Sequence, residues 1–114
     1  MGNDFYRKKK FKKAIEWYEK VDKYDLAQDE KTEYFFKLGY SYFNEEEFAD
    51  AKRAFYEIKD LTESDYYAPT QYYYSHLSYQ DEQYQTALEG FTKIKDEAGF
   101  SVIVPYYISQ ILFK

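Results

Sequence analysis

The sequence predicts an all-α fold made of successive helical hairpins. Its 114 residues include only four Gly and two Pro, which leaves little material for loops. Apolar residues recur at the three- and four-residue spacing that is typical of amphipathic helices. The pattern also returns along the chain, since Ala14, Ala51 and Ala87 occupy equivalent places 37 and 36 residues apart. A recurring interval of this length indicates that one helical unit is repeated.

One helix of each unit carries a stripe in which a small alanine is flanked by bulky residues. The three stripes are Phe11-Ala14-Tyr18-Val21, Phe48-Ala51-Phe55-Ile58 and Tyr84-Ala87-Phe91-Ile94. Charged side chains, such as Lys12 and Arg53, lie between the stripe residues. The pattern predicts amphipathic helices near residues 9–21, 45–60 and 82–95.

A second type of helix accompanies these. Its apolar stripes are Phe35-Leu38-Gly39-Tyr42, Tyr72-Ser75-His76-Tyr79 and Tyr106-Ser109-Gln110-Phe113, which predict helices near 31–43, 69–80 and 104–113. We expect Asn44 and Asp81 to cap the helices that follow them, because short polar side chains accept hydrogen bonds from free N–H groups. Pro69 and Pro105 fall early in their predicted helices, where a missing N–H costs little.

These residues resemble the tetratricopeptide repeat (TPR) family, whose motif reads Trp-x2-Leu-Gly-x2-Tyr followed by Ala-x3-Phe. Here Phe35-x2-Leu38-Gly39-x2-Tyr42 is followed by Ala51-x3-Phe55. Gly2-x2-Phe5 with Ala14-x3-Tyr18 is a partial first copy, and Tyr72 and Tyr79 with Ala87-x3-Phe91 form a third. The resemblance implies a right-handed superhelix of antiparallel helical hairpins. The residues that it assigns to packing are Ala14, Tyr18, Leu38, Gly39, Tyr42, Ala51, Phe55, Ala87 and Phe91.

The repeats divide a single domain, residues 1–114, into four segments. They are a partial first repeat (1–29), a second repeat (30–66), a third repeat (67–101) and the first helix of a fourth (102–114). Because the last segment lacks a second helix, we expect the chain to be part of a longer array. We also expect residues 102–114 to support a homo-oligomer, since an uncovered apolar helix face attracts another copy.

Composition excludes several classes of function. The chain has no Cys and a single His, so we expect no catalytic residues, no metal site, no cofactor and no enzyme activity. Its net charge of -5 argues against a nucleic-acid partner. No targeting or membrane-spanning segment is visible, so we expect a soluble chain without membrane insertion. The compartment stays open between cytoplasm and periplasm.

Two polar features have alternative interpretations. Residues 7–13 hold six cations in seven positions. They are either a solvated turn and helix face, or a patch for an acidic partner or for the acidic face of a neighbouring molecule. Nucleic acid is a third and weaker alternative, because no aromatic and basic groove runs through the rest of the chain. His76 lies among tyrosines, and it is either a packed side chain or a polar anchor for a ligand.

The excess of aromatic residues is the most informative feature for function. Tyr, Phe and Trp make up 24% of the chain, which is more than one apolar stripe per helix requires. In the TPR family the first helices line the concave surface of the superhelix. The resemblance therefore places Tyr6, Phe36, Tyr40, Phe43, Tyr73, Leu77 and Tyr107 in a peptide-binding groove.

Two functions follow from this placement. The first is a protein-protein interaction scaffold that binds a peptide or a helical segment of another protein. The second is a structural or self-assembling segment of a larger protein, with its aromatic faces buried between repeats or between copies. The position of the extra aromatic rings, open or buried, distinguishes the two.

Overall fold

The chain consists of helices and short connections in the computed structural model, which describes residues 2–113. The elements are α1 (Gly2–Arg7), α2 (Phe11–Glu19), the 3-10 helix η1 (Lys23–Asp25), α3 (Gln28–Asn44), α4 (Phe48–Tyr56), α5 (Tyr67–Gln80), α6 (Tyr84–Lys93) and α7 (Ile103–Leu112). No strand occurs in this part of the chain, so the all-α prediction is confirmed. Met1 and Lys114, the outer limits of the predicted segments 1–29 and 102–114, lie outside the described residues.

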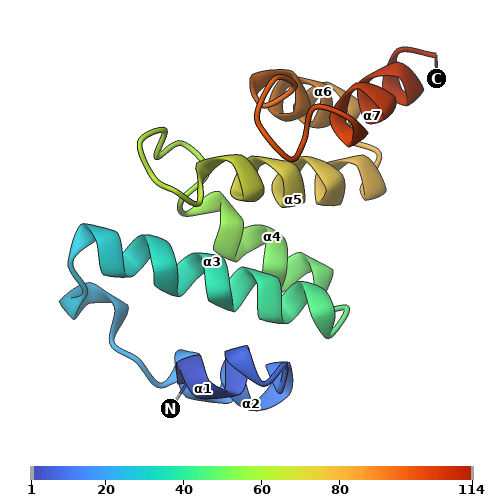
Figure 1. Ribbon diagram of the computed structural model, residues 1–114. Coiled ribbons are helices and arrows are strands. Elements are labelled where there is room, and N and C mark those ends of the chain that lie inside the picture. The colour runs from blue at the N-terminus through green and yellow to red at the C-terminus, as the bar shows by residue number, and fades with distance from the viewer. Residues whose placement is uncertain (1, 114) are drawn as a thin grey trace.

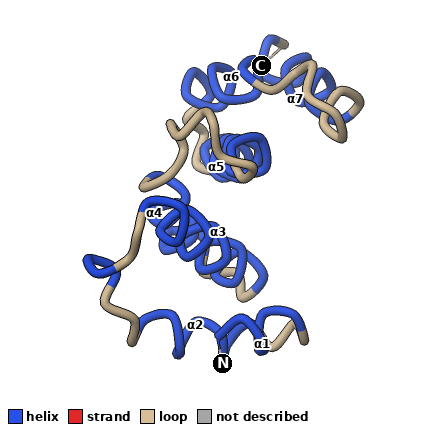
Figure 2. Tube along the Cα trace, turned by 60° about the vertical axis from the view of Figure 1, so that its left-hand side comes forward, coloured by secondary structure: helices blue, strands red, loops and turns tan. Residues whose placement is uncertain are grey.

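The helices are stacked in chain order (Figure 1). The most extensive contacts join consecutive helices, from α1 against α2 to α6 against α7. The N-terminal hairpin lies at one end of the stack and α7 at the other, as a second view also shows (Figure 2). The molecule is elongated, with principal extents of 44 × 28 × 23 Å. Local contacts of this kind are typical of repeat proteins, in which each unit touches mainly its neighbours.

Three turns of the same geometry close the hairpins α1–α2, α3–α4 and α5–α6. The central residue of each turn is in the left-handed region, with φ of 58° at Lys9, 60° at Glu46 and 62° at Glu82. The next backbone N–H reaches back to the end of the preceding helix, as when Glu47 N donates to Tyr42 O at 2.9 Å. This is the Schellman arrangement, which satisfies carbonyl groups at a helix end.

The turns also show that the predicted side-chain caps at Asn44 and Asp81 are wrong. Asn44 is the last residue of α3, and its side-chain amide donates to Tyr40 O at 2.8 Å. Asp81 follows α5 directly, and its carboxylate accepts a hydrogen bond from Lys52 Nζ at 3.1 Å. The next helices begin after Glu47 and Gln83, neither of which makes a side-chain cap. The turns satisfy carbonyl groups at the ends of α3 and α5, and neither Asn44 nor Asp81 caps the helix that follows it.

The turns correct the alignment of the third repeat by one residue. Gln83 N donates to Ser78 O at 2.8 Å, which makes Ser78, and not Tyr79, the equivalent of Tyr42. Ser75 then corresponds to Gly39 of the motif. Both lie at close helix crossings, because a Cβ on Gly39 would come within 2.8 Å of the Phe55 ring, and one on Gly90 would overlap Ser75 Oγ.

The core is formed by the alanine stripes. Ala14, Ala51 and Ala87 are fully buried, as are Phe55 and Phe91. Tyr18, Leu38 and Gly39 are also buried, and Tyr42 is half-buried. The second helices are shorter than predicted, since Ile58 and Ile94 lie beyond the ends of α4 and α6 and yet remain buried.

The predicted apolar stripe of α7 is not part of the core. Tyr106, Ser109, Gln110 and Phe113 are exposed, whereas Val104 and Ile111 are buried against the rest of the molecule. The reason is the order of the stack: α7 packs against α6, so the side of α7 that faces away from α6 has no neighbour among the described residues.

Candidate functional site

Six aromatic side chains from four helices form a continuous series, which we call the aromatic row. They are Tyr6 on α1, Tyr40 and Phe43 on α3, Tyr73 and His76 on α5, and Tyr107 on α7. The four helices follow one another at alternate positions in the stack, so the row extends from its N-terminal end to its C-terminal end. Five of the seven residues predicted for a groove belong to it.

Rings in the first part of the row contact one another directly. The Tyr6 and Tyr40 ring centroids are 5.9 Å apart, and those of Tyr40 and Tyr73 are 5.5 Å apart. Phe43 lies 5.1 Å from Tyr73. The two tyrosine pairs meet edge to face, and Phe43 is tilted against Tyr73; edge-on arrangements of this kind are favourable for aromatic pairs. The rings therefore hold one another in place without help from a partner.

His76 continues the row and is surrounded by rings. Its centroid is 5.9 Å from Phe43, 6.3 Å from Tyr72 and 5.7 Å from Tyr107, in edge-on geometry in each case. Nε2 lies 3.2 Å from the Gln80 side-chain amide, and the buried Nδ1 has no hydrogen-bond partner among the described residues. Burial lowers the pKa of His76, so the neutral imidazole is favoured.

Exposure separates the predicted groove residues into two groups. The six residues of the aromatic row are half-buried, with part of each ring open to solvent. Phe36 and Leu77 are buried, at 8% and 2% exposure. Phe36 stacks on Tyr66 at 4.8 Å and shares a core cluster with Leu77. These two side chains therefore join neighbouring hairpins.

Tyrosine hydroxyl groups gather along the row. Burial raises the pKa of Tyr6 to about 12, with a further contribution from the nearby Tyr40 hydroxyl. Burial and the neighbouring Tyr40 raise the pKa of Tyr73 to about 12, and burial together with a hydrogen bond to Tyr107 raises that of Tyr72 to about 12. These phenols stay protonated at neutral pH, so their O–H groups remain donors.

Sequence reasoning missed three aromatic residues beside the row. Phe11 contacts Tyr6 at 6.0 Å and Tyr40 at 5.7 Å, although its stripe position assigned it to the core. Tyr66 and Tyr72 flank Phe36 and Tyr107 respectively. The place of Phe11 in the apolar stripe predicted a core position and not a surface position. Phe11 is the first residue of α2, and it therefore lies at the edge of the stack.

Basic residues 7–13 form the turn between α1 and α2 and the adjacent helix ends. Arg7, Lys8, Lys9, Lys10, Lys12 and Lys13 are all exposed. Arg7 pairs with Asp4 on its own helix, and Lys13 lies 6.0 Å from the centre of the Phe5 ring. Lys37 is the cation closest to the row, at 5.4 Å from the Tyr6 ring, and it pairs with Glu33 at 2.6 Å.

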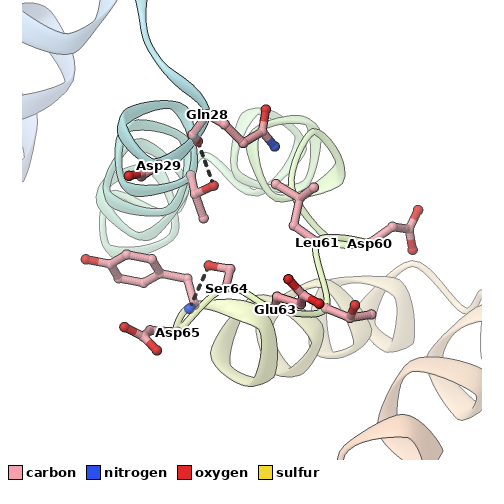
Figure 3. A pocket seen from close by; sticks show the side chains of 10 residues that line it. Gln28, Asp29, Asp60, Leu61, Glu63, Ser64 and Asp65 are labelled. Atoms are coloured by element: carbon pink, nitrogen blue, oxygen red, sulfur yellow. Dashed lines mark hydrogen bonds between the residues drawn. The ribbon is translucent and has the colours of Figure 1, made fainter.

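A cleft with a volume of about 580 Å³ lies away from the row. It is bounded by the start of α3 and by the connection between α4 and α5, and its lining includes the acidic residues Asp29, Asp60, Glu63 and Asp65. Figure 3 shows Leu61 pointing toward the middle of this cleft, while the Asp60 side chain points outward. Within the cleft, Tyr66 N donates to Ser64 Oγ at 3.0 Å, which stabilises the turn at the start of α5.

Residues 2–113 contain no group of three or more His, Cys, Asp or Glu side chains placed to hold a metal ion. None of the described helices has the length and hydrophobicity needed to cross a bilayer.

Comparison with known proteins gives no relative. No family model, no curated protein and no solved structure matches the chain. Membership of the TPR family therefore remains a prediction from the motif residues.

Proposed function

We propose that this chain is a non-catalytic protein-interaction module of the TPR type, and that it binds a peptide or a helical segment of another protein along the aromatic row. In this proposal the hairpins form a right-handed superhelix with the row on its concave side. The observation that carries the proposal is the continuity of the row, whose half-exposed rings contact one another from α1 to α7.

The chemistry of the row favours an apolar or amphipathic segment. Aromatic rings supply a large contact area at low conformational cost, and Tyr adds a hydrogen-bond donor. The nearest cation, Lys37, is already paired with Glu33. Recognition therefore depends on apolar anchors of the partner placed against the rings, with tyrosine hydroxyls orienting its polar groups.

A second function, a structural or self-assembling repeat segment, is favoured by a different observation. Phe36 and Leu77 are buried between hairpins, so part of the aromatic and apolar excess serves packing. Under this alternative the whole row stabilises the stack, and its replacement lowers stability without removing any binding.

Selection of ligands from a random peptide library tests the proposal. Peptides of about 12 residues displayed on phage are selected on the intact chain, and their affinities are measured for Tyr40→Leu and Tyr73→Leu. We expect each variant to weaken binding by about tenfold or more, as loss of an anchor contact does.

The matched controls are Tyr24→Leu and Tyr56→Leu, which alter tyrosines that are 82% and 59% exposed and lie outside the row. They should bind the same peptides as the unmodified chain. Circular dichroism verifies that all four variants keep their helices. Peptides that bind row variants and control variants equally well contradict the proposal.

A further inference from the structure

Lys31 on α3 differs from the other half-buried lysines of the chain. Residues 2–113 contain four such lysines, and three of them, Lys37, Lys52 and Lys59, each pair with a carboxylate. Lys31 forms neither an ion pair nor a side-chain hydrogen bond with any described residue. The sequence explains this, because positions 27, 28, 34 and 35, one helical turn away, are Ala, Gln, Tyr and Phe. Lys31 is therefore a partly desolvated cation that lacks an anionic partner, which is unfavourable for a charged group.

Lys31 lines a cavity of about 330 Å³ between η1, α3 and the residues that follow α4. The wall of the cavity is largely apolar, since it includes the half-buried Phe35 and Leu61 and the buried Ile58. A second lysine, Lys23, belongs to the lining, and its Nζ lies 5.8 Å from the centre of the Phe35 ring. No lining residue of this cavity belongs to the aromatic row.

The cavity and the acidic cleft of Figure 3 meet at Gln28 and Leu61, which line both. Their charges are opposite. The cleft contains four acidic residues, whereas the charged residues of the cavity are Lys23, Lys31 and Glu57. Two positive charges and one negative charge give the cavity a net charge of +1, although the whole chain has a net charge of -5. An anion is therefore attracted to the cavity and repelled by the neighbouring cleft.

We propose that this cavity binds an aliphatic carboxylate of about eight carbon atoms, with its carboxylate on Lys31 and its chain along Ile58 and Leu61. A carboxylate carries one negative charge, which balances the net charge of the cavity, whereas a phosphate monoester carries about -1.5 to -2 at neutral pH. The contact between ammonium and carboxylate is a charge-assisted hydrogen bond, which is stronger than a neutral one. The inference is independent of the aromatic row.

The volume of the cavity agrees with a ligand of this size. The space of 330 Å³ corresponds to about eleven molecules of liquid water at about 30 Å³ each. Octanoate, with its eight carbon and two oxygen atoms, fills a comparable space. Its chain also removes the apolar surface of Phe35, Ile58 and Leu61 from water, and this supplies affinity that a short anion such as acetate lacks.

A nuclear magnetic resonance titration of the intact chain with octanoate tests the proposal, with the methyl signals of Ile58 and Leu61 as the readout. These signals should shift together and saturate with a dissociation constant on the order of 0.1–1 mM, as is reasonable for a ligand of this size. Octan-1-ol keeps the chain without the charge, and acetate keeps the charge without the chain. Each of them should bind at least about tenfold more weakly than octanoate.

Three variants identify the groups that hold the carboxylate. Lys31→Met keeps the apolar stem and removes the charge, so it should weaken octanoate binding by about tenfold or more and leave octan-1-ol binding unchanged. Glu57→Gln removes the carboxylate that competes for the lysines, so it should strengthen octanoate binding by about two- to fivefold. The control, Lys93→Met, removes an exposed lysine at the end of α6 and should bind like the unmodified chain.

Four results overturn the proposal. They are the absence of a saturable shift at Ile58 and Leu61, equal affinity for octanoate and octan-1-ol, equal octanoate affinity of Lys31→Met and Lys93→Met, and octanoate shifts that are confined to the aromatic row.

Discussion

Three residues in the left-handed region determine where the helices of each hairpin end. Lys9, Glu46 and Glu82 occupy this region although none of them is glycine. A side chain in this conformation costs about 1–2 kcal/mol, which the Schellman hydrogen bonds and the packing of the following helix offset. This conformational strain remains at the three turns of the folded chain, and substitution of the strained residue by glycine can remove it.

Glu46→Gly should raise the free energy of unfolding by about 0.5–1 kcal/mol, because relief of the left-handed strain exceeds the added entropy of glycine in the unfolded chain. Denaturant titration measures the change. Glu45→Gly is the control, since Glu45 has a φ of -91° and gains nothing from glycine. An equal effect at both positions would mean that strain at Glu46 does not limit stability.

His76 makes stability depend on pH. Burial lowers its folded-state pKa below the usual value, so the unfolded chain binds a proton more readily as the pH falls. The stabilising contribution of the neutral ring is therefore present above the unfolded pKa of about 6.5 and is lost as the pH falls through the folded pKa. Because the chain has one His, no other imidazole contributes in this range.

Thermal melts between about pH 7.5 and about pH 5.5 should show a falling melting temperature for the unmodified chain. His76→Phe keeps an aromatic ring beside Phe43, Tyr72 and Tyr107 and removes the titrating group, so its melting temperature should change much less. The same slope in both proteins would exclude His76 as the origin of the pH dependence.

At the scale of the element, the alanines allow neighbouring helices to approach closely. Ala51 is fully buried within the cluster that also contains Phe55 and Leu77. Ala51→Leu should lower the free energy of unfolding by about 1–3 kcal/mol through overpacking. Ala49→Leu makes the same change at an exposed position of the same helix, and it should stay within about 0.5 kcal/mol of the unmodified chain. Similar losses at both positions would show that the buried stripe of α4 is wrongly assigned.

The sequence predicted the existence of the helices better than their ends. The alanine stripes located α2, α4 and α6, because a small residue between bulky ones has a clear helical period. The ends depended on left-handed turns formed by Lys9, Glu46 and Glu82, and no glycine marks these positions. In α5, aromatic residues occupy so many positions that the sequence analysis aligned Tyr79 with Tyr42, whereas the structure aligns Ser78 with it.

At the scale of the whole molecule, the candidate site depends on the order of the stack. The TPR resemblance placed Tyr6, Tyr40, Phe43, Tyr73 and Tyr107 together on the concave side of successive first helices. The rings of the first four contact one another in series, whereas Tyr107 joins them through His76. The burial of Phe36 and Leu77 could not be read from one helix, since it depends on how closely two hairpins approach. Tertiary packing therefore divides a uniform aromatic pattern into core and surface.

The most direct test of the proposed function is a nuclear magnetic resonance titration of the intact chain with a library-selected peptide, followed through the aromatic ring signals. Signals of the aromatic row, from Tyr6 to Tyr107, should shift together and saturate at one affinity, while those of Tyr24 and Tyr56 stay unchanged. Shifts confined to rings outside the row, or binding that leaves every ring of the row unchanged, would contradict the account.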